Sequence, residues 1–284
     1  MGEKLDTRAI GLDVGLSFIR WLTGAENLHY GLWTGLEARA ENLGRAQAAY
    51  TEKLFTYLPE GRLRILDVGG GAGVTAGKLT ALGHEVDIVV PSAFLAGRCR
   101  ENAPEARVHQ MRLQEFRSEP RFDLILFSES FQYIPRSEVF DKALSLLAPD
   151  GDILIADCFR SDDFQRGTGP RASGGGHPIS DIRSLIPQKG LTVIAEEDIT
   201  EAVAPSIDLE QALFNVFGHG IARIDAELRQ KRARSRWLIA RALNLIAGRD
   251  KLGSLSARLT GQERNAAQFR RDNRYMIFRM RRAG

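Results

Sequence analysis

Hydrophobic and polar positions follow two different periods along the middle of the chain. Short apolar runs bounded by glycine, proline or charged residues predict strands, and apolar residues three or four apart predict helices between them. The predicted strands are, in chain order, residues 64–68, 85–90, 107–109, 122–127, 152–158, 191–196 and 274–280. Because strands that alternate with helices form βαβ units, we expect an α/β fold with a doubly wound, mostly parallel seven-stranded sheet.

Helical periodicity dominates the two regions outside this alternation. Residues 1–60 are predicted to be helical and to form an N-terminal lid, and residues 207–269 are predicted to be a helical, basic insertion that caps the substrate. The core then consists of residues 61–206 and 270–284.

Glycine and proline mark two connections within this core. A helix over residues 137–147 is expected to end at the turn Pro149-Asp150-Gly151. The polar, glycine-rich segment 160–176 is predicted to be a mobile loop.

Composition is that of an ordinary globular protein, with 43% hydrophobic and 26% charged residues. We expect neither a signal peptide nor a transmembrane segment, because no long uncharged apolar run is present. Cys99 and Cys158 fit no disulfide or metal-binding pattern. A cytoplasmic, reducing setting without a bound metal is therefore expected.

Charge is divided unequally along the chain. Residues 221–284 hold 17 Lys and Arg against 5 Asp and Glu, whereas the remaining 220 residues hold 22 against 31. A basic region of this kind is typical of a surface that docks onto lipid headgroups, nucleic acid or an acidic substrate. It is equally compatible with a solvated helical face.

Three glycines at alternate positions follow the first predicted strand, in Asp67-Val68-Gly69-Gly70-Gly71-Ala72-Gly73. Without side chains, Gly69, Gly71 and Gly73 allow a sharp turn and a close approach to a ligand. The next helix points its N-terminus toward the same place. The segment also contains Gly71-x-Gly73-x-x-Ala76, the alanine variant of a dinucleotide-binding fingerprint.

This motif resembles the first motif of class I S-adenosylmethionine (SAM)-dependent methyltransferases, acidic-x-Gly-x-Gly-x-Gly. Asp67 and the downstream pattern favour that family over a nicotinamide enzyme. The resemblance covers about residues 62–200. It implies that the glycines, with Gly70 beside them, lie against the methionine part of SAM. Asp67 would order the loop and the amino acid group of the cofactor.

The second strand departs from the family pattern. These enzymes usually end it with an acidic residue that binds both ribose hydroxyls, whereas Val90 occupies that position here. Asp87, three residues earlier, is not expected to reach the strand tip. The resemblance places these residues near the ribose and the adenine: Val90, Pro91, Ser92, Met111, Arg112 and Leu113. For Met111 and Leu113, ordinary core packing is an equal alternative.

The segment after the fourth strand, Ser128-Glu129-Ser130-Phe131-Gln132-Tyr133-Ile134-Pro135, resembles the floor between cofactor and acceptor in small-molecule methyltransferases. Ser128 and Glu129 are predicted to contact the cofactor, and Glu129 is also a candidate catalytic residue. A carboxylate at a strand tip rarely serves packing. Tyr133 is a predicted substrate contact. The segment lacks the Asn/Asp-Pro-Pro-aromatic pattern of DNA base methylation.

Aromatic and histidine side chains are expected to line the acceptor site. His29-Tyr30-Gly31-Leu32-Trp33 resembles a lid segment, in which Tyr30 contacts SAM and the outer two residues contact substrate. A helix-packing aromatic cluster is the alternative. His177 follows a glycine run and is a candidate general base, unless it is a plain surface residue. The remaining predicted substrate contacts are Asp157 and His219.

The expected function is SAM-dependent methylation of an oxygen or carbon atom of a small, apolar, aromatic or lipid-like molecule. An RNA methyltransferase that uses the basic region is one alternative, although a small acceptor is favoured over nucleic acid. A degenerate fold that binds without catalysis is another. The apolar, arginine-flanked helix around Trp237 would either roof the site or contact an anionic membrane peripherally.

Overall fold

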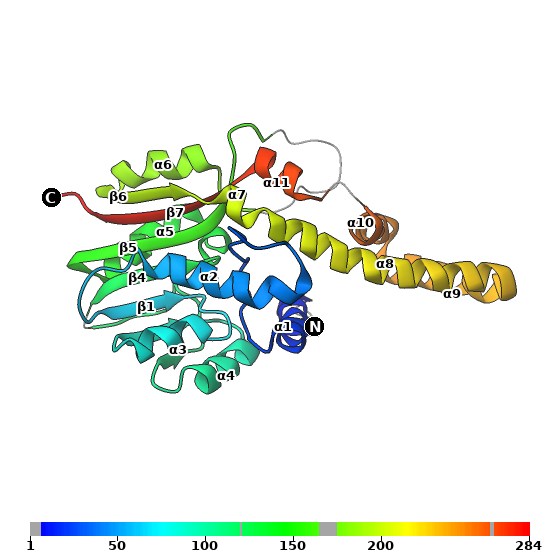
Figure 1. Ribbon diagram of the computed structural model, residues 1–284, viewed down its shortest axis with the longest axis horizontal. Coiled ribbons are helices and arrows are strands. Elements are labelled where there is room, and N and C mark those ends of the chain that lie inside the picture. Colours follow the sequence, from blue (N-terminus) through cyan, green and yellow to red (C-terminus); the bar gives the residue numbers. More distant parts are fainter. Residues whose placement is uncertain (1–6, 120, 165–174, 262–263) are drawn as a thin grey trace.

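The computed structural model describes residues 7–119, 121–164, 175–261 and 264–284. A seven-stranded sheet forms its centre, with helices on both faces (Figure 1). The strands are β1 (Arg64–Val68), β2 (Glu85–Val89), β3 (Arg107–His109), β4 (Phe122–Ser128), β5 (Leu147–Arg160), β6 (Leu191–Asp198) and β7 (Asn273–Arg282). Their order in the sheet is β3-β2-β1-β4-β5-β7-β6, and only β7 runs antiparallel to its neighbours. The predicted doubly wound fold is confirmed.

The helices are α1 (Thr7–Thr23), α2 (Leu43–Phe55), α3 (Val74–Ala81), α4 (Ala93–Asn102), α5 (Arg136–Leu146), α6 (Ile179–Gln188), α7 (Thr200–Val203), α8 (Pro205–Lys231), α9 (Ala233–Ala247), α10 (Arg249–Thr260) and α11 (Ala266–Asp272). The described residues also form two single-turn 3₁₀ helices, η1 (Ala40–Asn42) and η2 (Phe131–Tyr133).

Alternate side chains of the central strands serve two separate hydrophobic cores. On β4, Leu124 and Leu126 join the core beneath α2, α3 and α4, whereas Ile125 and Phe127 join the core beneath α5 and α6. A strand that is buried on both faces has a continuous apolar run in its sequence, and the run in β4 therefore predicts a strand. Because both faces of the sheet are packed in this way, the residues at its carboxyl edge have fixed positions.

One boundary predicted from the sequence, the start of β5, is wrong. The tripeptide from Pro149 to Gly151 lies inside β5 rather than before it, because the ladder already begins with Leu147 opposite Phe122. The extra residues are absorbed by an irregularity in the register between Phe122 and Leu124. Gly151 is required there, since a Cβ atom would lie 2.9 Å from the Phe122 carbonyl oxygen.

The N-terminal region is helical only in part. Residues 24–39 contain no helix and cross the carboxyl edge of the sheet as an irregular segment between α1 and η1. Of the predicted mobile loop 160–176, residues 165–174 lie outside the described part of the chain. Arg160 itself belongs to β5.

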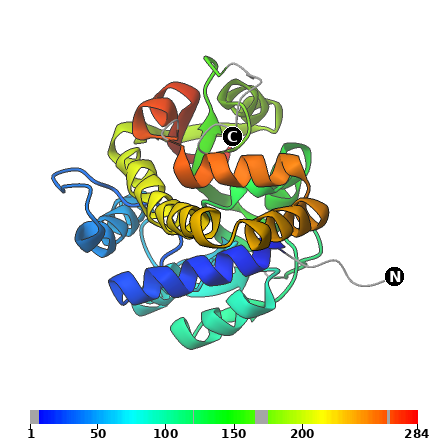
Figure 2. The same ribbon diagram turned by 90° about the vertical axis from the view of Figure 1, so that its right-hand side faces the viewer.

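Helices α8, α9 and α10 occupy the predicted insertion. Helix α8 leaves the sheet at its carboxyl edge and extends away from the body, with α9 beside its far end (Figures 1 and 2). Helix α10 returns along α8, whose Gly218 allows the close approach of the Leu259 backbone. Within the described residues, no helix has both the length and the apolar character needed to cross a bilayer.

Candidate active site

The glycine loop after β1 adopts the conformation that the sequence predicts. Gly69, Gly71 and Gly73 all have positive φ, at +74°, +54° and +88°. A Cβ atom on Gly69 would lie 2.5 Å from the Cβ atom of Ser130, so the loop packs directly against the tip of β4. A Cβ atom on Gly71 would meet only Leu28 Cδ1, at 3.8 Å, so this glycine faces the open side of the loop.

Asp67 lies beneath this loop with its side chain 1% exposed. Its Oδ2 atom is buried without a hydrogen-bond partner among the described residues. Burial raises the pKa of this carboxyl from 3.8 to about 7. A buried polar atom that lacks a partner is rare in proteins and calls for a ligand or a functional explanation.

Glu129 has the most unusual backbone of the described residues, since it alone outside glycine has a positive φ, +55°. Such a conformation is strained for a residue with a side chain and is often found at functional sites. The Glu129 amide donates to the Ala156 carbonyl oxygen at 2.9 Å, and Ser130 Oγ donates to the Val68 carbonyl oxygen. These bonds hold the tip of β4 against β1 and β5.

The Glu129 carboxyl accepts two hydrogen bonds, and both end on Oε1. The backbone amide of Tyr30 and the hydroxyl of Tyr275 donate to it, each at 2.8 Å. Oε2 has no partner among the described residues. Burial, opposed by these two bonds and reinforced by the charge of Asp157, raises the pKa of Glu129 from 4.5 to about 8.

Two tyrosines that the sequence analysis did not single out connect this carboxyl to the rest of the edge. The Tyr50 and Tyr275 hydroxyls lie 2.8 Å apart, and the Tyr50 hydroxyl also lies 3.1 Å from Ser128 Oγ. Both tyrosines are buried. Periodicity places Tyr50 and Tyr275 on inward faces, but nothing local separates a buried functional tyrosine from a buried structural one.

Asp157 and His177 lie around η2. Gln132 donates to Asp157 through its backbone amide at 3.0 Å and through Nε2 at 2.8 Å, and burial raises the pKa of Asp157 from 3.8 to about 7. His177 Nε2 lies 2.9 Å from the Ile134 carbonyl oxygen, and its ring meets Phe131 edge to face. Both side chains thus hold the segment after β4, and their predicted contacts with substrate remain predictions.

Residues 26–33, called here the strap, cover the glycine loop. The Glu26 carboxylate anchors one end through Arg98 at 2.7 and 2.8 Å and Asn102 at 2.8 Å. Trp33 anchors the other end, since its Nε1 donates to Ser206 Oγ at 2.8 Å. The strap is therefore fixed at both ends and carries the Tyr30 amide to Glu129.

Three predicted contacts belong to the strap. Tyr30 is half-buried and meets Phe269 edge to face. His29 stacks on Tyr50 with 4.5 Å between the ring centroids, and burial lowers its pKa from 6.5 to about 4. Trp33 is buried against α8 through Ser206. The Tyr30 ring also packs against Tyr275, and its backbone amide reaches Glu129, while the predicted contacts of these three residues with cofactor and substrate remain predictions.

The residues predicted near the ribose and adenine lie beyond the ends of β2 and β3. Val90 and Leu113 are buried in opposite cores, Met111 is half-buried, and Pro91 and Arg112 are exposed. Ser92 Oγ caps α4 by accepting from the Leu95 amide. Asp87 is buried among Arg64, Arg107 and His109, as expected for a side chain that does not reach the strand tip.

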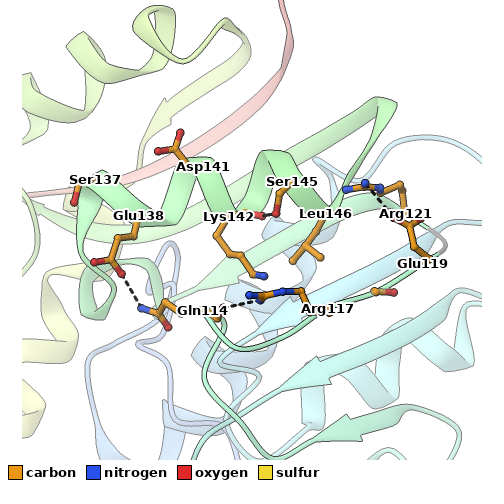
Figure 3. A pocket seen from close by; sticks show the side chains of 11 residues that line it. Gln114, Arg117, Glu119, Arg121, Ser137, Glu138, Asp141, Lys142, Ser145 and Leu146 are labelled. Carbon is orange, nitrogen blue, oxygen red and sulfur yellow. Dashed lines mark hydrogen bonds and ion pairs between the residues drawn. The ribbon is translucent and has the colours of Figure 1, made fainter.

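Other polar positions lie apart from this cluster. Tyr133 is exposed on η2, and His219 is exposed midway along α8. An open cavity of about 850 Å³ beside α5 is lined by polar and charged side chains such as Arg117, Glu138 and Lys142 (Figure 3). None of the predicted site residues lines it.

A methyltransferase-domain family model matches residues 39–198, which is more than half of the chain. The chain belongs to this family of methyltransferases, which confirms the resemblance seen in the glycine motif. No curated protein matches the sequence.

Solved structures with the same fold include three of named activity. The cyclopropane synthase MmaA2 from Mycobacterium tuberculosis superposes with a TM-score of 0.66 at 16% identity, covering 99% of both chains. A putative sarcosine dimethylglycine methyltransferase from Galdieria sulphuraria gives 0.64 at 17%, covering 96% of this chain and 99% of the other. Geranyl diphosphate C-methyltransferase from Streptomyces coelicolor, solved with S-adenosyl-L-homocysteine, gives 0.62 at 14%, covering 95% and 97%.

Proposed function

We propose that the chain binds SAM at the carboxyl ends of β1, β4 and β5 and methylates an oxygen or carbon atom of a small apolar, aromatic or lipid-like molecule. The observation that carries this proposal is the half-buried carboxyl of Glu129, whose backbone is strained and whose neighbour Ser130 packs against Gly69 of the glycine loop. Membership of a methyltransferase family supports the reaction class.

The residues around the glycine loop fit SAM. Three glycines in the left-handed region leave the loop free of side chains, and Gly71 faces its open side. The unpartnered Oδ2 of Asp67 would hold the loop and the cofactor's ammonium group. The N-terminus of α3 supplies amide donors for the cofactor's carboxylate.

Charge at this edge favours a cationic ligand. Asp67 and Asp157 are buried and Glu129 is half-buried, and the pKa values of the three carboxyls are raised to about 7, 7 and 8. Each costs free energy to ionise as long as no cation is near. A ligand with an ammonium and a sulfonium group would offset that cost, so SAM should bind more tightly as pH rises from 6 to 8.5, with release of protons.

Glu129 is placed to accept a proton from the acceptor molecule. The Tyr30 amide and the Tyr275 hydroxyl fix Oε1, so Oε2 is the atom left for the substrate. A pKa of about 8 lies close to neutral pH, where a general base both takes up and releases a proton readily. When bound, SAM supplies a methyl group on positively charged sulfur, which an oxygen or carbon nucleophile can attack.

The surroundings of Glu129 suit an acceptor with apolar or aromatic surface. Tyr30, Tyr50, Tyr275 and Phe269 form a cluster of rings on the same side of the sheet. Two structural neighbours are named as a cyclopropane synthase and a geranyl diphosphate C-methyltransferase, and the second name gives geranyl diphosphate as the acceptor of that protein. Because His177 Nε2 donates to the Ile134 carbonyl oxygen, Nδ1 is the ring nitrogen that would act as a second proton acceptor.

Calorimetry with SAM and assays of methyl transfer test this proposal. Transfer from methyl-labelled SAM would be measured to a panel of prenols, fatty acids and phenols. Glu129→Gln should reduce kcat at saturating SAM at least 100-fold. Glu138→Gln, on the exposed face of α5, is the matched control and should retain full activity.

The outcomes separate the competing functions. Absence of heat with SAM would contradict the proposal and favour a non-catalytic fold, and stabilisation by NAD(H) alone would favour a nicotinamide enzyme. Transfer of label to RNA but to none of the small acceptors would favour an RNA methyltransferase. Full activity of Glu129→Gln would refute the role of this carboxyl.

A further inference from the structure

The far half of α8 together with α9, residues 219–247, forms a hairpin that we call the arm. It projects from the carboxyl edge of the sheet, on the side that Figure 2 faces (Figures 1 and 2). Helix α8 is about 40 Å long at 1.5 Å per residue, and its last buried residue is Gly218. Within the described side chains of the arm, none is buried. The arm therefore contributes nothing to the core of the domain.

Large apolar side chains cover the arm. On α9, Trp237, Leu238 and Leu245 are 58%, 59% and 80% exposed. Together with Arg234 and Arg241 they recur at three- and four-residue spacing and so share one face of the helix. The opposite face lies against α8, because Arg236 reaches Asp225 there at 2.6 Å. The apolar face of α9 thus points outward.

Exposure of this kind continues on α8. Phe217, at the base of the arm, and Ile221 and Ile224 within it follow a four- and three-residue spacing, and all three are more than half exposed. Soluble proteins rarely expose contiguous apolar surface of this kind unless it meets a partner.

Positive charge surrounds the apolar side chains. Arg223, Arg229, Lys231 and Arg236 pair with the two acidic residues of the arm. Arg232, Arg234 and Arg241, by contrast, have no acidic partner among the described residues. The Arg241 guanidinium lies 5.4 Å from the centre of the Trp237 ring. The arm therefore carries a net positive charge directly beside its apolar face.

We propose that the arm docks this protein onto the surface of an anionic phospholipid bilayer. Trp237, Leu238 and Leu245 would enter the boundary between headgroups and acyl chains, while Arg234 and Arg241 bind headgroup phosphates. The exposed aliphatic side chains Leu238, Leu245, Ile221 and Ile224 outnumber the one tryptophan of the arm, Trp237, and this favours lipid over RNA, because single-stranded RNA is bound by stacking of bases on aromatic rings. The carboxyl edge that holds the proposed site lies at the base of the arm (Figure 1).

Vesicle flotation with the full-length protein tests this inference. The vesicles contain phosphatidylcholine with 30% phosphatidylglycerol, and pure phosphatidylcholine vesicles are the comparison. We expect binding to the anionic vesicles that weakens at least tenfold in pure phosphatidylcholine and weakens further as salt is raised. Circular dichroism and SAM calorimetry on each variant show that the domain and its proposed site are intact.

Two paired variants separate the contributions of charge and apolar surface. Arg234→Gln/Arg241→Gln should weaken anionic binding about 25-fold, at about fivefold for each arginine. Trp237→Ser/Leu238→Ser should weaken it on both vesicle types. Their controls, Arg62→Gln and Leu82→Ser, change exposed residues at the opposite edge of the sheet and should bind as the wild type does.

Three outcomes would overturn the proposal. In the first, the folded wild-type protein does not float with anionic vesicles. In the second, the arm variants bind these vesicles as well as their controls do. In the third, the protein binds polyuridylate but not vesicles, and the arginine variant loses this binding. If the protein does not bind vesicles but forms a concentration-dependent dimer, and Trp237→Ser/Leu238→Ser makes it monomeric, the apolar face is a contact between two copies instead. None of these results bears on SAM binding, so the docking role and the proposed function fail separately.

Discussion

Asp67→Asn should make the protein more stable in alkaline solution while weakening its binding of SAM. The carboxyl has a folded-state pKa of about 7 against an ordinary value of 3.8, because it is buried and Oδ2 lacks a partner. Each pKa unit corresponds to about 1.4 kcal/mol, so ionising this group costs the folded state up to about 4 kcal/mol. An amide of the same shape carries no such cost.

The sign of the effect follows from proton binding. Between about pH 4 and pH 7 the folded chain keeps the Asp67 proton and the unfolded chain has lost it, so the wild-type free energy of unfolding falls as pH rises. Between pH 5 and pH 8.5 this carboxyl should lower the wild-type free energy of unfolding by about 3 kcal/mol. The reason is that the folded state binds one more proton than the unfolded state over about two pH units of this range. Above pH 7 the contribution levels off.

Urea unfolding followed by circular dichroism at pH 5 and pH 8.5 measures this difference. The free energy of unfolding of Asp67→Asn relative to wild type should rise by about 3 kcal/mol between the two pH values. Asp162→Asn, which alters an exposed carboxyl, should show no such change. Calorimetry should show a Kd for SAM at least tenfold higher in Asp67→Asn. If the unfolding curves of wild type and Asp67→Asn shift in parallel between the two pH values, the assignment of a buried, proton-binding carboxyl is wrong.

Three further variants probe the same edge. Tyr275→Phe removes a donor to Glu129 and should raise by about one unit the pKa of the limb on which kcat increases with pH, and an unchanged profile would show that the tyrosine is only structural. Gly71→Val places a branched side chain at φ +54° on the open side of the loop and should raise the Kd for SAM at least 100-fold, with circular dichroism unchanged. His177→Ala should reduce kcat at least tenfold at an unchanged Kd for SAM, and undiminished turnover would make His177 a packing residue.

The glycine loop shows how much of the site a local pattern can reveal. Asp67 and the three alternating glycines are adjacent in sequence, and the positive φ angles follow from the chemistry of those residues alone. The strand periods were similarly informative, because burial on both faces of the sheet gives apolar runs at β1 and β4. These local signals were enough to predict the fold and the family.

The beginning of β5 shows where a prediction from the local sequence fails. Pro149-Asp150-Gly151 has the composition of a turn, yet Leu147 already pairs with Phe122, and the register irregularity absorbs the extra residues. Pairing with β4 overrode the local preference. The strap is a similar case, because residues 26–33 are fixed by Arg98, Gln47 and Ser206 rather than by helical periodicity.

The sequence by itself determined the strands, the glycine loop and the types of residue at the strand tips, because each of these depends on residues a few positions apart. Only the tertiary structure decided how Glu129 is held. Tyr30, Tyr50 and Tyr275 come from three distant segments and converge there, and Glu129 is bent into a backbone conformation that its residue type disfavours. The physical reason is that packing between distant elements sets burial and hydrogen bonding, and these in turn set the pKa values of Asp67, Glu129 and Asp157.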